Sequence, residues 1–201
     1  MEKINSEKDT ILVWLDFGPY SYLNMGIITE LYKLQKFDFI GIVTTKQDLS
    51  FFKNQKIILF KKLFYYPKCY IGKTTYNLEK LKKAENEFGL NLWLDIFADR
   101  SFYKFWTNFH KFTRDEILII IENSLEFFID ILEKYKPKKI LMQHAGENVS
   151  NLLLYRVSKK IGIETLMPIN LHLKNRIHIS NNFTSDEISD DFLKSITNYS
   201  K

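Results

Sequence analysis

The residue types best suited to catalysis in this sequence are a histidine and a glutamate three positions apart, His144 and Glu147. Imidazole titrates near neutral pH and a neighbouring carboxylate can orient it, so the pair predicts a general base. The same pair also suits a capping or loop-stabilising role, and the residues alone leave both interpretations open. Gly146, which lies between them, is expected to line the same site.

Two further groups of residues have types that suit ligand binding. Asp16, Gly18 and Tyr20 follow the first apolar run of the chain. Arg100, beside Asp99 in an aromatic-rich segment, suits either the binding of a phosphate or carboxylate or a structural ion pair. Asp16, Gly18, Tyr20 and Arg100 are therefore candidate ligand-binding residues.

The motifs of several common activities are missing. Gly18-Pro19 does not make a dinucleotide fingerprint, and no loop has the P-loop pattern, so nicotinamide, flavin and P-loop chemistry are not expected. The four histidines lack metal-ligand spacing with cysteine or with paired carboxylates. We therefore expect neither a cofactor nor a metal.

Short apolar segments that alternate with helical patterns must position these residues. Such runs of about five residues are typical of a parallel sheet covered on both faces. The expected strands are residues 11–15, 39–43, 56–60, 139–142 and 164–169, with a further strand at 176–179. The expected helices are one ending at Leu34, a short one near 47–52, those at 75–88, 114–135 and 148–160, and one opened by a capping box at 184–187.

The predicted fold class is α/β, with a mostly parallel, Rossmann-like sheet and helices on both faces. We expect strand 11–15 to be central and to lie beside strand 139–142. The loops 16–21 and 143–148 would then flank one crevice at the carboxyl ends of the strands, where such sheets bind ligands. Helix N-termini after both loops should present free amides, which suits an anionic or hydroxyl-rich ligand.

The long helix at 114–135 should begin with a capping box formed by Thr113 and Glu116. Its apolar side is expected to face the sheet through Leu118, Ile121, Leu125, Phe128 and Leu132. One solvated acidic face is expected from Glu122, Glu126, Asp130 and Glu133. Before this helix, segment 90–112 carries an aromatic stripe that suits core packing or, alternatively, ligand stacking.

The length of 201 residues and the hydrophobic content of 45% favour one domain over residues 1–201, with 1–10 disordered and 170–201 as a C-terminal extension. The net charge of +5 comes from lysine doublets spread along the chain, which favours a solvated surface over nucleic-acid binding. Cys69 is the only cysteine and is expected to be an inert thiol. Without an apolar stretch long enough to span a membrane, the expected location is the cytoplasm.

Two segments carry a resemblance to a known group of enzymes. The first segment resembles the closing unit of the N-terminal domain in two-domain GT-B enzymes, such as sugar-nucleotide epimerases and capsule-type glycosyltransferases. It consists of residues 136–147, the helix at 148–160, Gly162-Ile163 and the strand to Ile169. Residues 92–102, ahead of 113–116, resemble the N-terminal region of surface or capsule polysaccharide biosynthesis proteins.

The resemblance implies a function for the domain. In these families the N-terminal domain receives the acceptor, a C-terminal domain holds the nucleotide-sugar, and the chemistry takes place between them. Residues 1–201 would then be the N-terminal, acceptor-side half of a larger glycosyltransferase-like protein in cell-surface or capsular polysaccharide biosynthesis. Gly146-Glu147-Asn148 replaces the Gly-Asp-Thr of the epimerase loop, which argues against epimerase activity.

The partners implied are a sugar or lipid-linked glycan acceptor and a C-terminal nucleotide-sugar domain, with peripheral membrane association left open. Two other functions stay open. One is a non-catalytic ligand-binding or partner-docking α/β domain. The other is a small hydrolase or transferase that uses His144 and Glu147.

Overall fold

The computed structural model is an α/β fold with a six-stranded sheet of order β3-β2-β1-β4-β5-β6. It describes residues 8–16, 18–99, 101–102, 110–143, 145–146, 148–170 and 176–182. The strands are β1 (Asp9–Leu15), β2 (Phe37–Val43), β3 (Phe60–Tyr65), β4 (Lys139–Leu141), β5 (Glu164–Asn170) and β6 (Ile177–Ser180). β1 to β5 are parallel to their neighbours, whereas β6 is antiparallel to β5. The fold class and the central place of β1 beside β4 are as predicted.

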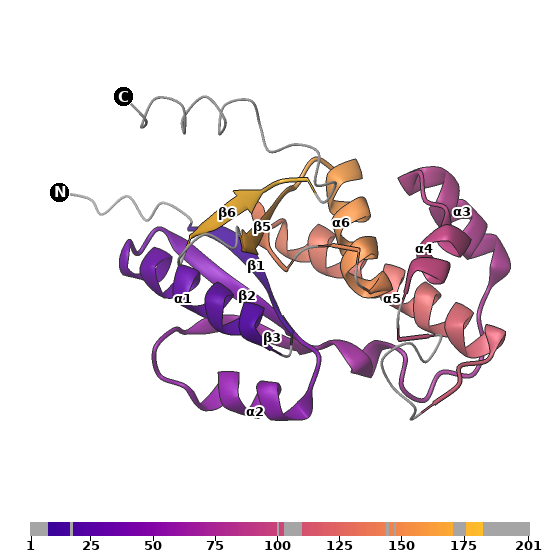
Figure 1. Cartoon of the computed structure of the whole chain (residues 1–201), viewed down its shortest axis with the longest axis horizontal. Coiled ribbons are helices and arrows are strands. Elements are labelled where there is room, and N and C mark those ends of the chain that lie inside the picture. Colours follow the sequence, from indigo (N-terminus) through magenta and orange to yellow (C-terminus); the bar gives the residue numbers. More distant parts are fainter. Residues whose placement is uncertain are drawn as a thin grey trace.

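Helices cover both faces of this sheet (Figure 1). They are α1 (Pro19–Lys33), α2 (Lys46–Asn54), α3 (Leu78–Phe88), α4 (Leu92–Ala98), α5 (Arg114–Tyr135) and α6 (Val149–Lys160), with a short 3-10 helix, η1, at Tyr66–Cys69. α1 and α2 lie on one face and α5 and α6 on the other. α3 and α4 pack against α5 and α6.

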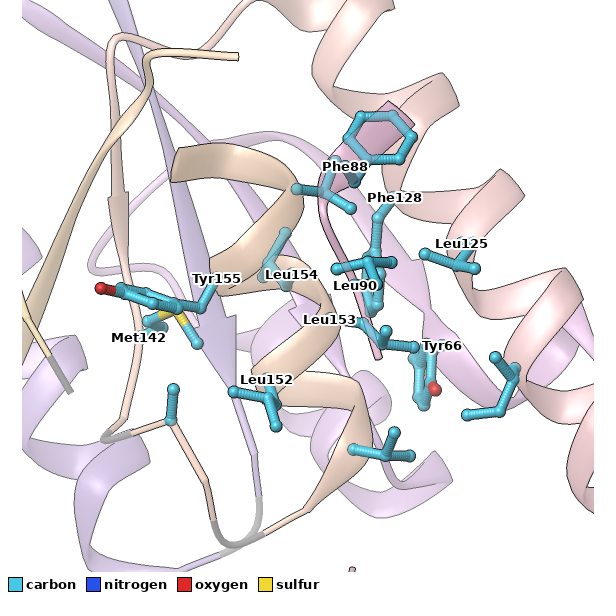
Figure 2. Close-up of a cluster of buried hydrophobic side chains, with 14 of the residues drawn as sticks. Tyr66, Phe88, Leu90, Leu125, Phe128, Met142, Leu152, Leu153, Leu154 and Tyr155 are labelled. Atoms are coloured by element: carbon cyan, nitrogen blue, oxygen red, sulfur yellow. The ribbon is translucent and has the colours of Figure 1, made fainter. Parts of the chain in front are cut away.

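Alternation along β1 produces two hydrophobic cores, because successive side chains of a strand point to opposite faces. Ile11, Val13 and Leu15 pack under α1 and α2. Leu12 and Trp14 pack under α5 and α6, in the larger core. Figure 2 shows part of this core, where Leu152, Leu153 and Leu154 of α6 lie among side chains from α5 and from the end of α3. The sheet is therefore buried on both sides, as its apolar strands require.

The sequence predictions for α5 are confirmed except on its acidic side. The Thr113 and Glu116 side chains form the capping box, and the five predicted apolar residues lie in the larger core. Glu122, however, is only 8% exposed and does not belong to a solvated face. Its carboxylate accepts a hydrogen bond from the Asn77 backbone N–H at 2.7 Å, one residue before α3 begins. Glu122 therefore helps to hold α3 on α5.

The prediction of a third strand at 56–60 is wrong, because β3 runs from Phe60 to Tyr65. The Gln55 side chain explains the shift. Its Oε1 accepts from the backbone N–H groups of Ile57 and Ile58, and its Nε2 donates to the carbonyl of Ile58 at 2.6 Å. These bonds hold the apolar residues after α2 in a turn, so the strand starts later, at Phe60.

Several other boundaries differ from the sequence predictions. β1 begins at Asp9, inside the stretch expected to be disordered, and β6 joins the sheet from within the expected C-terminal extension. α3 begins at Leu78, where the Asn77 side chain caps it, rather than at residue 75. In the aromatic segment, Phe102 and Phe112 lie outside helices, and their rings pack edge to face with centroids 5.3 Å apart. Residues 103–109 and the expected helix opened at 184–187 lie outside the described residues.

Candidate functional site

The strand order reverses between β1 and β4. From β1 the chain proceeds outward through β2 and β3, and it then crosses to β4 on the other side of β1. In parallel α/β sheets, ligands bind at the carboxyl ends of the strands where this reversal occurs. The candidate site is therefore the edge formed by the ends of β1, β2 and β4.

Three polar side chains from three different strand ends meet at this edge. Asp16 follows β1, Thr44 follows β2, and Gln143 lies two residues after β4. The Thr44 hydroxyl donates to Asp16 Oδ1 at 2.5 Å, and the Gln143 amide donates to Asp16 Oδ2 at 3.2 Å. Asp16 is only half-buried, and a carboxylate is a hydrogen-bond acceptor that suits the hydroxyl groups of a ligand.

Asp16 was predicted from the sequence as a site residue, whereas Thr44 and Gln143 were not. Both occupy the first or second position after a strand that the apolar runs predicted. A polar residue at the first or second position after a strand that neighbours β1 is the sequence signal that could have identified them.

The first turn of α1 also borders the site. Gly18 is the N-cap residue, with φ +112°, a conformation that side-chain-bearing residues rarely adopt. Pro19 follows as the first helical residue, and no side chain caps the helix. Tyr20, the next residue, is 37% exposed. The predicted residues Asp16, Gly18 and Tyr20 are thus neighbours at this edge, at the entrance to α1.

The N-terminus of α6 does not present the free amides that the sequence analysis expected. The backbone N–H of Val149 donates to Asp99 Oδ2 at 2.6 Å, and that of Asn151 donates to Asn148 Oδ1 at 3.0 Å. The Asp99 carboxylate therefore stands where an anionic ligand would meet the helix dipole. A phosphate group is not accommodated at these two amides.

Asp99 is 3% exposed and is fully engaged by the fold. Besides Val149, its carboxylate accepts from the backbone N–H groups of Ser101 and Phe102 at 2.7 and 3.0 Å. Its neighbour Arg100 lies outside the described residues, so the predicted anion-binding role of Arg100 stays a prediction.

The candidate general base also stays a prediction. His144 and Glu147 both lie outside the described residues. Gly146, between them, is exposed and has φ +109°.

Buried polar groups without a hydrogen-bond partner occur next to this edge. Ser21 is the third residue of α1 and Asn151 the third residue of α6, and both side chains are buried. The Ser21 hydroxyl and both polar atoms of the Asn151 amide have no partner among the described residues. The same holds for Trp14 Nε1 and Asn24 Oδ1, although the Asn24 amide donates to the Trp14 carbonyl at 3.0 Å. None of these four residues was predicted from the sequence.

Such groups are costly to the fold. A buried polar atom without a partner destabilises a protein by about 1–3 kcal/mol. Ser21 and Asn151 lie in the first turns of the two helices that follow β1 and β4, a position that suits a ligand-binding role for their unpaired groups.

Reactive side chains near the end of β3 are held in their neutral forms. Burial raises the pKa of the Cys69 thiol to about 12, with the nearby Ser124 hydroxyl only partly opposing the effect. Burial likewise raises the pKa of the Tyr66 phenol, whose oxygen lies 2.7 Å from that of Ser124. A thiol that stays protonated at neutral pH is a poor nucleophile, so Cys69 does not supply a reaction centre.

No group of three metal-ligating side chains that could hold a metal ion is found among the described residues. Within the same part of the chain, no helix is both long and apolar enough to cross a membrane. The chain matches no protein-family model and none of the curated proteins compared with it.

Proposed function

We propose that this chain is the acceptor-binding domain of a glycosyltransferase-like protein of cell-surface polysaccharide synthesis. The edge formed by the ends of β1, β2 and β4 would bind the hydroxyl groups of a sugar acceptor. The observation that carries the proposal is the Asp16 carboxylate, held between Thr44 and Gln143 at the point where strand order reverses.

The chemistry of this edge favours a neutral, hydroxyl-rich ligand. Carboxylate, amide and hydroxyl side chains together offer both acceptors and donors, as sugar hydroxyls require. The buried groups of Ser21 and Asn151, which have no partner in the described chain, add one hydroxyl and one amide in the first turns of α1 and α6. Activation of the acceptor hydroxyl would fall to His144, predicted from the sequence to accept its proton as a general base.

The charges of the same edge disfavour a nucleotide-sugar. Asp99 occupies the first amide of α6, and Asp16 adds a second carboxylate at the edge. At the start of α6, phosphates would therefore meet the Asp99 carboxylate instead of a free Val149 amide. This supports the acceptor half of a two-domain enzyme over the donor half.

The test is ligand-observed NMR with two panels of compounds. The first panel contains neutral oligosaccharides and lipid-linked sugar analogues, and the second contains nucleotide-sugars. We expect binding from the first panel only, and an affinity at least about tenfold lower for Asp16→Asn, because a charged acceptor is lost. Asp130→Asn, which changes an exposed carboxylate on α5, is the matched control and should bind as the unmodified chain does.

A turnover assay on residues 1–201 completes the test. Alignment of two reactants accounts for about 7–11 kcal/mol of a barrier, and half of a two-domain site does not provide it, so no sugar transfer is expected. Tight nucleotide-sugar binding, or transfer by the isolated chain, would contradict the proposal. If no compound of either panel binds, a non-catalytic docking domain would be favoured instead.

A further inference from the structure

The outer edge of β3 is open. β3 pairs only with β2, on its inner side, and the described chain places no strand on its outer side (Figure 1). The register shift near Lys61 confines regular pairing to Lys62–Tyr65. The outward backbone groups of this stretch are a template for one more strand.

Two hollows lie along this edge. One, of about 310 Å³, is lined by residues between Phe52 and Leu63 at the start of β3. The other, of about 400 Å³, extends from Leu49 of α2 over the end of β3 to Phe127 of α5. They share Lys53, Lys62 and Leu63, so they are continuous along the strand.

The charge along these hollows has one sign. Lys53, Lys62 and Lys68 line the second hollow and are exposed, and none forms an ion pair with any carboxylate in the described part of the chain. Among the described residues no acidic side chain lines either hollow, although Lys61, at the first hollow, pairs with Asp38 at 2.6 Å. The lysines lie on α2, β3 and η1, so the positive charge follows the edge across three elements.

Lysines on an edge strand can also serve to prevent unwanted pairing. That role would leave the surroundings polar. Here Leu59, which lines the first hollow, is 78% exposed, and Ile57 and Phe51, each next in the chain to a lining residue, are 59% and 55% exposed. An exposed apolar surface rimmed by unpaired lysines is typical of an interaction site.

We propose that the Lys62–Tyr65 edge binds an extended acidic segment of a partner protein, which adds a strand to the sheet. Backbone bonds to β3 would supply affinity, as in other strand-addition complexes. Acidic side chains of the segment would meet Lys53, Lys62 and Lys68, and its apolar side chains would pack beside Leu63 on one face of the sheet and Phe64 on the other. This surface is separate from the edge that contains Asp16.

The probe is a fluorescein-labelled peptide of eight residues that alternates glutamate and valine, followed by fluorescence anisotropy. We expect saturable binding, slower hydrogen exchange of the amides in 62–65, and an affinity that falls with added salt. Changing Lys53, Lys62 and Lys68 together to glutamine should lower the affinity about tenfold, because each exposed pair contributes modestly.

The matched control changes Lys36, Lys83 and Lys160 together to glutamine, which removes the same charge from exposed lysines elsewhere and should leave binding unchanged. A peptide with N-methylated valines keeps its charge but cannot extend a sheet, and it should not bind. Equal loss in both triple variants, equal binding of the methylated peptide, or no binding of the acidic peptide would each overturn the proposal. Binding of phosphatidylglycerol vesicles, but not of the peptide, at these lysines would assign the surface to a membrane instead.

Discussion

Asp99 occupies the position where an anionic ligand would approach the N-terminus of α6. Its carboxylate accepts bonds from Val149 and from the turn at Ser101 and Phe102, and it is nearly inaccessible to solvent. The side chain therefore joins the end of α4 to the start of α6. Ser21 and Asn151 show the opposite arrangement, because they are buried polar groups that the fold leaves without partners.

Replacing Asp99 by asparagine should destabilise the fold. The amide nitrogen cannot accept a hydrogen bond, so at least one buried N–H group loses its partner, at a cost of about 1–3 kcal/mol. Urea unfolding measures the free energy of unfolding. Asp130→Asn, an exposed change on α5, serves as the control, and an Asp99 effect no larger than that of the control would refute the capping role.

Replacing Ser21 by alanine should stabilise the free protein by about 1 kcal/mol, because a buried hydroxyl without a partner is removed and alanine favours the helix. The same change should weaken sugar binding if the hydroxyl serves a ligand. Ser158→Ala is a matched control, since its hydroxyl is equally buried but donates to the Leu154 carbonyl at 2.6 Å. A Ser21→Ala variant that is less stable than Ser158→Ala would contradict the argument.

At the scale of an element, α5 shows how a short-range motif determines where a helix begins. Glu116 accepts from the backbone N–H of Thr113 at 2.7 Å, and the Thr113 hydroxyl accepts from the Glu116 N–H at 3.3 Å. The bond from the Thr113 backbone is the main reason why the pKa of Glu116 is lowered, with the Thr113 hydroxyl and His110 adding to the effect. The charged form of Glu116 is thus the form that the fold favours.

This lowered pKa predicts a pH dependence. A carboxyl whose pKa is lower in the folded state contributes stability above its unfolded pKa of about 4.3, and the contribution is lost as pH falls through the folded pKa. Glu116→Gln should therefore make the urea midpoint less sensitive to pH between about pH 5 and 3. Glu133→Gln, an exposed change near the end of the same helix, is the control. The prediction would be contradicted if the urea midpoint changed equally with pH in the unmodified protein, in Glu116→Gln and in Glu133→Gln.

For the whole molecule, the two cores share one sheet, and α3 and α4 contribute side chains to the larger core. Leu81, Phe88, Leu92 and Ile96 connect these outer helices to α5 and α6. Asp95 of α4 adds a largely buried ion pair with Arg156 of α6, at 3.0 Å. Burial raises the pKa of Asp95 and Arg156 opposes that rise, so the pair joins the outer helices to the sheet layer electrostatically as well.

These shared contacts predict a single cooperative unfolding transition. Far-UV circular dichroism measures the helix content of the whole chain. Tryptophan fluorescence is sensitive to the surroundings of each tryptophan, which include Trp14 in the central strand and Trp93 on α4. Both signals should follow the same urea curve. Trp93→Phe should leave the fluorescence midpoint unchanged if the outer helices unfold with the sheet. Separate transitions would show that α3 and α4 form an independent unit.

The sequence by itself determined the α/β class, the central place of β1, and most strands and helices. The reason is physical: apolar runs, capping boxes and glycine or proline stops act within about five residues, so they can be recognised without knowing the fold. Asp16 was predicted on the same basis, because it directly follows an apolar strand. The start of β3 was missed because the Gln55 side chain holds the next apolar residues in a turn.

Only the tertiary structure decided which polar side chains meet. Thr44 and Gln143 reach Asp16 from positions 28 residues and 127 residues away along the chain, and Asp99 caps a helix that begins 50 residues later. Glu122 faces Asn77 rather than solvent for the same reason. Long-range pairs of this kind depend on sheet order and helix packing, which no local pattern encodes, because a polar residue looks the same in the sequence whether its partner is water, backbone or another side chain.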